Sequence, residues 1–252
     1  MMLGSKVFDP MMPSKSLRKD YKMKINGFQT LTLLDYPGKV GATLFLGGCN
    51  FRCPFCQNKN LVLHPEQESF LPEDEVLAYL KKRQGILDGV CISGGEPTLH
   101  RELPDLIGRI KSLGFLVKLD TNGSRPDVIR QLHTDHLIDY VAMDIKSSRQ
   151  NYPKVSGREH PDLDAVMESA KYLMSGTLEY EFRTTVVREL HDASDFSDIA
   201  DWIGGCRAYY LQAYRDSGSV IHPGFSSYSR EELESFCEIL RKKIPLVELR
   251  GI

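Results

Sequence analysis

Three cysteines within eight residues are the densest chemical feature of the chain. Cys49, Cys53 and Cys56 have the spacing C-x3-C-x2-C and directly follow a strand-forming run at 42–47. Thiolates grouped so closely can bind one metal centre, and a [4Fe–4S] cluster normally takes four of them. A loop that supplies only three leaves one iron open to chelation by a small molecule. The spacing therefore predicts an iron–sulfur centre that also binds a ligand.

Two other metal centres can be built from the same cysteines. A zinc site of the Cys3His type would recruit His64, although no second Cys pair follows at zinc-site spacing. An electron-transfer cluster would take a fourth thiolate from Cys91, Cys206 or Cys237. We interpret those three as small core residues, because Cys91 lies mid-strand and Cys237 lies on the apolar stripe of a predicted helix.

Polar residues also accompany four later strand-forming runs. These are Gly94-Gly95-Glu96 after the second run, Asp120-Thr121-Asn122 after the third, Asp144-Ile145-Lys146 after the fourth, and Arg183 within the fifth. The two glycines allow the backbone to come close to a ligand, and Glu96 offers an anion to an ammonium group. An arginine inside an apolar strand needs an anionic partner. Because parallel strands end at one edge, we expect these residues to surround the cysteine loop.

Six strand–helix units position these residues. Strands are expected at 42–47, 88–93, 115–120, 138–143, 178–187 and 208–213, and amphipathic helices at 73–84, 102–113, from Pro126, 163–175, 195–203 and 230–242. Strict alternation predicts parallel strands with right-handed crossovers. A closed barrel needs eight units, so six predict an α/β fold of the partial (βα)6, TIM-like barrel type. A flat doubly wound sheet is the alternative.

Composition limits the class of protein. The chain has 252 residues, a mass of 28.6 kDa, 41% hydrophobic residues and a net charge of −2. We expect a single domain over residues 23–252, preceded by a disordered extension over residues 1–22 that shows no periodicity. The charge balance gives no reason to expect nucleic acid or an anionic membrane as a partner. Without a signal peptide or an apolar run of about 20 residues, we expect a cytoplasmic location with reduced thiols.

The cysteine loop, with the aromatic Phe55 just before its last Cys, resembles the radical S-adenosylmethionine superfamily. The resemblance implies one [4Fe–4S] cluster held by the three cysteines and an S-adenosylmethionine molecule on its open iron. It further implies that Gly94, Gly95 and Glu96 bind the amino group of that molecule. The same resemblance implies a metal-binding oxidoreductase, which agrees with the cytoplasmic location expected above.

The later segments are similar to those of enzymes that activate glycyl-radical enzymes. The D-T-N-G segment holds Asp120 and Asn122, and the D-x-K segment holds Asp144 and Lys146. The similarity implies that Asp144 and Lys146 bind the methionine carboxylate or ribose, and that Asp120 with Asp144 binds a monovalent cation. We expect Arg183 to bind a carboxylate of S-adenosylmethionine or a structural acidic partner. Arg215 stands where related activases carry a His, so its role is left open.

Residues 27–39 and the stretch 45–58 (FLGGCNFRCPFCQN) closely resemble activating proteins of anaerobic ribonucleoside-triphosphate reductase, and the likeness extends over residues 24 to about 250. It implies reductive cleavage of S-adenosylmethionine to a 5′-deoxyadenosyl radical, which abstracts hydrogen from the α-carbon of a glycine in the partner reductase. No separate catalytic base is implied. The electron donor implied is flavodoxin or ferredoxin.

Three alternatives stay open on the sequence. In the first, the partner is a different glycyl-radical enzyme, of the pyruvate formate-lyase kind. In the second, the enzyme acts on a small molecule such as a purine-like precursor. The third alternative is an iron–sulfur or zinc protein that is not an enzyme. A small-molecule enzyme requires a closed pocket with additional anion-binding groups, whereas an activase requires a barrel that is open at its side.

Overall fold

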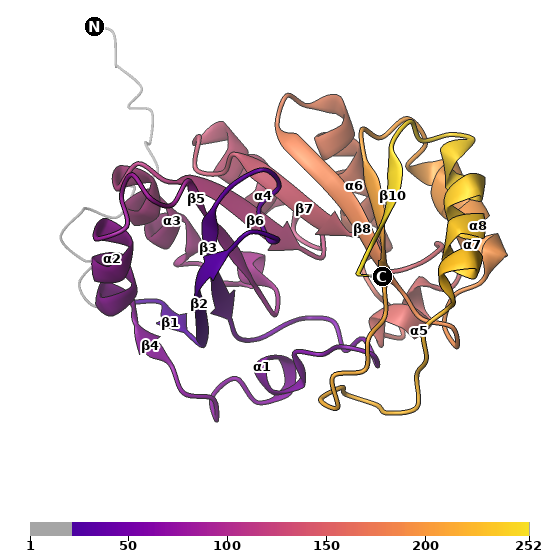
Figure 1. The fold of residues 1–252 in the computed structure, drawn as a ribbon, viewed down its shortest axis with the longest axis horizontal. Helices are drawn as coiled ribbons and strands as arrows, with labels where there is room; N and C mark the ends of the chain where they lie inside the picture. The colour runs from indigo at the N-terminus through magenta and orange to yellow at the C-terminus, as the bar shows by residue number, and fades with distance from the viewer. Residues whose placement is uncertain (1–21, 252) are drawn as a thin grey trace, which may run out of the picture.

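The computed structural model describes residues 22–251, and a single eight-stranded sheet runs through them (Figure 1). Along the sheet the strands follow their order in the chain. They are β2 (Gly27–Thr32), β3 (Gly41–Leu46), β5 (Gly89–Gly94), β6 (Leu116–Thr121), β7 (Tyr140–Asp144), β8 (Glu179–Val186), β9 (Tyr209–Ala213) and β10 (Val247–Arg250). All neighbours are parallel except β2, which pairs antiparallel with β3.

Helices follow the strands and cover the outside of the curved sheet (Figure 1). The longer ones are α2 (Glu73–Lys81), α3 (Leu103–Ser112), α4 (Pro126–Thr134), α6 (Leu163–Ser175), α7 (Ala193–Trp202) and α8 (Arg230–Arg241). Shorter elements are α1 (Lys59–Leu63), a 3-10 turn at Pro97–Leu99, α5 (Tyr152–Ser156) and a small pair of strands, β1 (Lys24–Ile25) and β4 (Leu71–Pro72). Right-handed crossovers between successive strands place all the crossover helices on one face.

The strand order confirms the predicted α/β fold and distinguishes the partial barrel from the doubly wound sheet. A doubly wound sheet reverses its strand order at a switch point, and this sheet does not. Within the described residues, β2 pairs only with β3 and β10 only with β9, so the barrel wall stays open between them. All six predicted strands are present, shifted by one or two residues at their ends.

The two edge strands, β2 and β10, were not predicted from the sequence. β10 has only four residues, and β2 is half exposed with an irregular register against β3, so neither shows a strong apolar pattern. The predicted helix 73–84 ends at Lys81, and the predicted helix 195–203 begins earlier, at Ala193, because Asp192 forms a capping box with Asp195. Of the extension predicted over residues 1–22, all but Lys22 lies outside the described residues.

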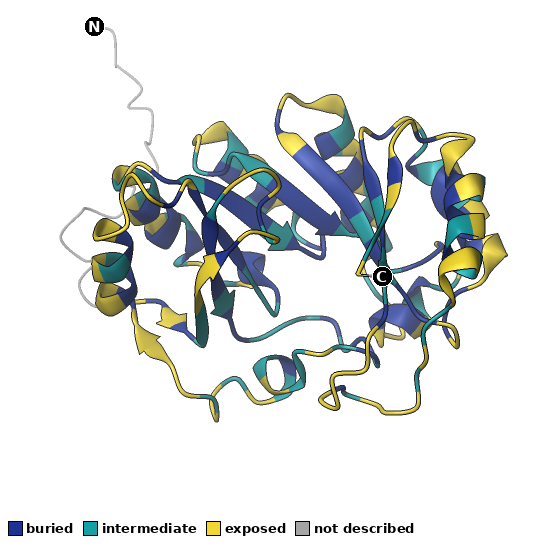
Figure 2. Cartoon of the chain, viewed as in Figure 1, coloured by how far each residue is buried: buried dark blue, intermediate teal, exposed yellow. Residues whose placement is uncertain are grey.

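The two faces of the sheet differ in polarity. On β6, Val117 and Leu119 belong to the apolar core under the helices, whereas Lys118 and Asp120 pair with each other on the opposite, inner face. Buried residues fill the strands and the inner sides of the helices, while the exposed ones lie on the outer helix surfaces and in the loops (Figure 2). The barrel interior is therefore polar. In the part of the chain that the structure describes, no helix has the length and apolar character needed to cross a membrane.

Candidate active site

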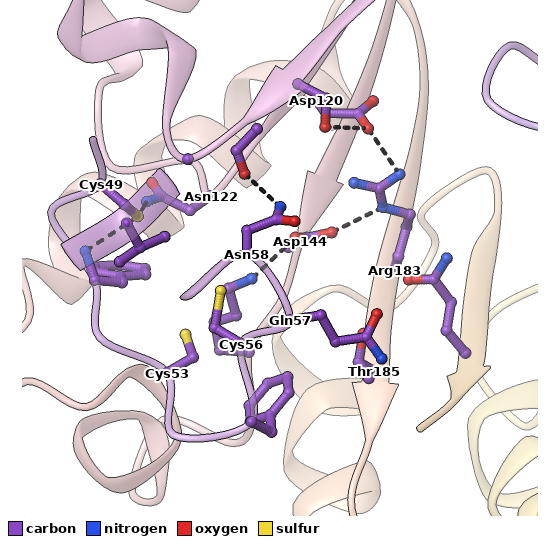
Figure 3. A pocket seen from close by; sticks show the side chains of 18 of the residues that line it. Cys49, Cys53, Cys56, Gln57, Asn58, Asp120, Asn122, Asp144, Arg183 and Thr185 are labelled. Carbon is purple, nitrogen blue, oxygen red and sulfur yellow. Dashed lines mark hydrogen bonds and ion pairs between the residues drawn. The ribbon is translucent and has the colours of Figure 1, made fainter. Parts of the chain in front are cut away.

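The cysteine loop lies at the carboxyl end of β3 and forms one wall of a cavity of about 390 Å³ (Figure 3). Cys49, Cys53 and Cys56 all line this cavity, together with the rings of Phe51 and Phe55. A turn that joins the amide of Cys56 to the carbonyl of Cys53 at 3.0 Å brings these two cysteines together. The structure thus gathers the three predicted thiols on one surface.

The chemistry of these thiols fits a bound metal centre. Burial raises the pKa of Cys49 to about 11 and that of Cys53 to about 12, and it also raises the pKa of Cys56. Thiols this buried keep their protons unless a metal cation replaces them. None of the six cysteines forms a disulfide. Among residues 22–251, however, no three His, Cys, Asp or Glu side chains lie close enough together to hold one metal ion, so the three thiols share a cavity wall without forming a single-ion site.

The alternative ligands lie elsewhere. His64 does not line the cavity, and its half-exposed ring faces Glu66 at 3.8 Å. Cys91, Cys206 and Cys237 are buried and do not line the cavity either. None of these four residues therefore shares the cavity wall with Cys49, Cys53 and Cys56.

The glycines at the end of β5 line the cavity, and they also allow two loops to touch. The amide of Gly95 donates to the carbonyl of Leu46 at 2.7 Å, and the amide of Glu96 donates to the carbonyl of Gly48 at 2.8 Å. Gly94 has a φ of +117°, and a Cβ there would lie 2.3 Å from the oxygen of Leu46. The two glycines were expected to let the backbone come close to a ligand. In the structure they also let it come close to the backbone at Leu46 and Gly48, where the cysteine loop begins.

Glu96 differs from its prediction. It is completely buried and, unlike the eight other predicted ligand-binding residues, it does not line the cavity. Its carboxylate accepts hydrogen bonds from the amide and hydroxyl of Thr98, the hydroxyl of Thr121 at 2.8 Å and the amide of Asn122 at 2.6 Å. Protein donors therefore occupy the anion that was expected to face an ammonium group. In this structure Glu96 joins the end of β5 to the end of β6.

A chain of alternating charges lines the opposite wall (Figure 3). Arg183 donates from Nε to Asp144 at 2.8 Å and from Nη1 to Asp120 at 3.2 Å. Lys146 donates to the second oxygen of Asp144 at 2.9 Å, and Lys118 pairs with the second oxygen of Asp120. The guanidinium therefore occupies the position between the two carboxylates that the expected monovalent cation would need. The monovalent cation stays a prediction, and in the described residues Arg183 supplies the positive charge shared by these two carboxylates.

The ion pairs set the protonation of the network. Burial alone would raise the pKa of Asp144, but the Arg183 and Lys146 cations outweigh it and hold the pKa well below its usual range. The pKa of Asp120 is lowered in the same way, against burial, by Arg183 and Lys118. Burial opposes the charge of Lys146, yet Asp144 raises the pKa of its ammonium. All of these groups are charged at neutral pH.

Asn122 connects the end of β6 to the cysteine loop. Its Nδ2 donates to the side-chain oxygen of Asn50 at 2.8 Å and lies 3.8 Å from the sulfur of Cys49. Its own oxygen accepts from the amide of Ser124 at 2.9 Å, which fixes the orientation of the side chain. Asn122 thus holds the loop as well as lining the cavity.

Several residues that line the cavity were not predicted from the sequence. Asn58 donates to the carbonyl of Gly94 at 2.8 Å, and its place in the loop after Cys56 was the only signal for it. Thr185, Gln212 and Arg250 reach the cavity from β8, β9 and β10. Arg215 also lines the cavity; it is exposed, and its Nε donates to the carbonyl of Gly251 at 2.9 Å.

Residues 43–203 match the family model described as the Radical SAM superfamily. The chain belongs to this superfamily. Membership implies S-adenosylmethionine and a [4Fe–4S] cluster as cofactors, consistent with the thiols and the cavity described above. The radical SAM part of the chain, from β3 to α7, contains every predicted site residue.

Relatives within the radical SAM superfamily have different substrates. A Methanocaldococcus jannaschii protein named "Putative glycyl-radical enzyme activating enzyme" is 33% identical over 92% of this chain and 97% of its own length. The 7-carboxy-7-deazaguanine synthase of Halobacterium salinarum is 26% identical over 70% of this chain and 66% of its own. SuiB of Streptococcus suis, solved with its precursor peptide SuiA, has the same fold, with a TM-score of 0.66 at 15% identity. The match covers 83% of this chain and 48% of that one.

Proposed function

We propose that this radical SAM enzyme generates a glycyl radical on a partner enzyme. The similarity to a named glycyl-radical activating enzyme over 97% of that protein's length carries the proposal. The open barrel wall between β2 and β10 supports it, because a protein loop can enter there and bring a glycine α-carbon to the cavity. Glycine suits this approach, since it has no side chain to obstruct it.

Several of the cavity residues have a proposed part in holding the cofactors. Cys49, Cys53 and Cys56 would hold the cluster, and Phe55 lines the cavity beside them. Once bound, the cluster and S-adenosylmethionine together supply the reductive cleavage that yields a 5′-deoxyadenosyl radical. Lys146 and Arg183 present cations to the methionine carboxylate.

The remaining residues orient the same ligand. The backbone at Gly94 and Gly95 binds its amino end, and Asn122 keeps the cysteine loop in place beside it. Asp120 and Asp144 orient the cations and accept hydrogen bonds from the ribose. These side chains bind, orient and exclude water, and none needs to act as a base.

The proposed partner is an anaerobic ribonucleoside-triphosphate reductase. The resemblance over residues 27–39 and 45–58 supports this choice. In the structure Asp35 accepts a hydrogen bond from Thr43 at 2.6 Å, and Tyr36 is buried against Tyr140 with ring centres 5.9 Å apart. Of the 33–40 segment only Tyr36 is buried, whereas Leu33, Leu34 and residues 37–39 are exposed.

The test is anaerobic reconstitution, reduction, and incubation with candidate glycyl-radical enzymes while electron paramagnetic resonance spectra are recorded. We expect a glycyl radical on the reductase. With deuterium on the α-carbon of the partner's glycine, label should appear in 5′-deoxyadenosine. Label that never came from any glycyl-radical enzyme offered would refute the proposal.

A second candidate is a radical SAM enzyme that acts on a small molecule. The similarity to a 7-carboxy-7-deazaguanine synthase favours it, as do Arg215 and Arg250, two cavity cations beyond the Arg183 network that suit an anionic substrate. Arg250 is already held by Glu181 through two bonds of 2.8 Å, which weakens the argument. Deuterium transfer from a small substrate in the same assay would establish this candidate instead.

A further inference from the structure

Two polar side chains of the cavity wall have no hydrogen-bond partner within residues 22–251. They are the hydroxyl of Thr185 on β8 and the amide of Gln212 on β9. Every other charged, amide or hydroxyl side chain that lines the cavity is bound to another group of the described chain. Thr185 and Gln212 therefore keep their full hydrogen-bonding capacity for a ligand.

The strand register brings these two residues side by side. Thr185 and Gln212 are direct partners across the parallel strands β8 and β9, and both face the cavity, so their side chains emerge next to each other. Both are half-buried, which leaves them accessible from the cavity. In Figure 3 Thr185 lies on the strand that also carries Arg183. We call the two side chains the Thr185–Gln212 pair.

The next residue in this row is Arg250, the partner of Gln212 on β10. Its guanidinium is held by the buried carboxylate of Glu181 through two bonds of 2.8 Å, and it lies 3.3 Å from the centre of the Tyr210 ring. The charge beside the pair is therefore already compensated. An uncharged donor and acceptor beside a neutralised arginine suit a neutral polar ligand better than a phosphate or a carboxylate.

The pair lies next to the open side of the barrel. Most residues proposed to hold S-adenosylmethionine come from the ends of β5, β6 and β7, whereas the pair is on β8 and β9, beside the edge strand β10. The cysteine loop also reaches this end, because Gln57 donates to the carbonyl of Arg215 and the amide of His222 donates to that of Pro54 at 2.8 Å. A segment that enters through the open wall can therefore contact the pair beside the cysteine loop.

We propose that Thr185 and Gln212 bind the backbone N–H and C=O of one residue in the segment that carries the target glycine. The inference rests on the proposed function and names the groups that recognise its protein substrate. In an extended segment the N–H and C=O of one residue point to the same side, as they do toward a neighbouring strand. The amide of Gln212 can accept from the first and donate to the second, and the Thr185 hydroxyl adds a further bond.

Backbone recognition suits this substrate because glycine offers no side chain to bind. The two residues position the glycine and do not react. One hydrogen atom leaves the α-carbon and becomes part of 5′-deoxyadenosine, and one unpaired electron stays on the carbon. Neither Thr185 nor Gln212 gains or loses a proton or an electron in this step.

The test measures how well hydrogen abstraction is coupled to cleavage of S-adenosylmethionine. Gln212→Leu removes the amide with little change in size, and Gln131→Leu makes the same change at an exposed position of α4 outside the cavity. Each reconstituted enzyme is reduced with photoreduced deazaflavin and incubated with the partner reductase deuterated at its glycine α-carbon. Radical yield is measured by electron paramagnetic resonance, and deuterium per 5′-deoxyadenosine by mass spectrometry.

We expect Gln212→Leu to raise the KM for the partner about tenfold, as the loss of one or two hydrogen bonds would. Deuterium per 5′-deoxyadenosine should fall, since a misplaced glycine no longer supplies the hydrogen. Calorimetry should give an unchanged dissociation constant for S-adenosylmethionine, and 5′-deoxyadenosine formation without partner should also be unchanged. Thr185→Val should shift the KM in the same direction by less, and Gln131→Leu should behave like the unmodified enzyme.

Each other outcome decides against the inference or against the proposed function. Unchanged KM and deuterium transfer in Gln212→Leu would overturn the inference alone. Weaker binding of S-adenosylmethionine in that variant would also overturn it, because the amide would then serve the cofactor. If Gln212→Leu fails to bind iron, Thr185→Val decides on the same measurements, since it removes only a hydroxyl. A missing glycyl radical with the unmodified enzyme would instead contradict the proposed function.

Discussion

A Cβ on Gly95 would lie 1.9 Å from the carbonyl oxygen of Gly48, the residue that precedes the first cysteine of the loop. The next amide, that of Glu96, donates to the same oxygen at 2.8 Å. The end of β5 and the start of the cysteine loop therefore meet backbone to backbone. A change at Gly95 acts on the thiols as well as on the bound ligand.

Gly95→Ala should lower the iron content of the reconstituted enzyme. The added methyl group must displace the Gly48 carbonyl, and overpacking of this kind costs about 1–3 kcal/mol of folding free energy. Iron per chain and the visible absorbance measure the effect. Gly108→Ala in α3 is the control, since a Cβ there meets nothing within 4 Å and a helical alanine adds stability. Full iron content in the Gly95 variant would show that the loops separate freely.

Alanine at Cys49, Cys53 or Cys56 should abolish the cluster and the formation of 5′-deoxyadenosine. These thiols line the cavity, and no fourth cysteine among the described residues does so. The matched changes at Cys91, Cys206 and Cys237 should leave about four irons per chain. Loss of iron from the Cys237 variant would contradict the assignment.

Arg183→Gln should destabilise the apo chain and weaken binding of S-adenosylmethionine. It leaves the Asp120 and Asp144 carboxylates without their shared guanidinium, and removing one partner of a buried pair costs about 3–5 kcal/mol. Urea unfolding and calorimetry measure the two effects. Arg125→Gln is the control, because its pair with Asp127 is exposed and contributes less than about 1 kcal/mol. If the two variants lost the same free energy of unfolding, the structural role given to Arg183 would be wrong.

Binding of S-adenosylmethionine should not depend on the monovalent cation in the buffer. Arg183 already stands between Asp120 and Asp144, so sodium and potassium have no site to fill there. Titrations in sodium, potassium and choline chloride at equal ionic strength should give the same dissociation constant. A lower dissociation constant in potassium chloride than in the other two salts would instead support the cation site that the sequence predicted.

Mild acid should destabilise the chain through His191. Burial lowers the pKa of this imidazole, which accepts from the Val187 amide at 3.1 Å and contacts the Lys146 carbonyl at 2.8 Å. The unfolded chain then binds more protons below a pH of about 6.5, so the free energy of unfolding falls as pH drops, by up to about 1.4 kcal/mol per pH unit. Urea unfolding from pH 7.5 to 5.5 should show this slope. His191→Gln should make the free energy of unfolding depend less on pH over this range. An unchanged slope in that variant would show that other groups cause the pH dependence.

Local features of the sequence were sufficient to predict the cysteine loop, the six central strands and the polar strand ends. Spacing, glycine pairs and apolar periodicity are all read over a few residues, and parallel strands necessarily bring their carboxyl ends to one edge. The edge strands β2 and β10 were missed, because half-exposed strands lack a continuous apolar run.

Only the tertiary structure decided which polar groups neutralise one another. Arg183 forms ion pairs with Asp120 and Asp144, which lie 63 and 39 residues before it in the chain. The carboxylate of Glu96 faces away from the cavity and accepts hydrogen bonds from residues 2 to 26 positions further along the chain. These pairings depend on strand order, register and the face on which each side chain emerges. A sequence shows that a carboxylate is present at a strand end, but whether that carboxylate faces a ligand or a neighbouring cation is determined by the three-dimensional packing of strands far apart in the chain.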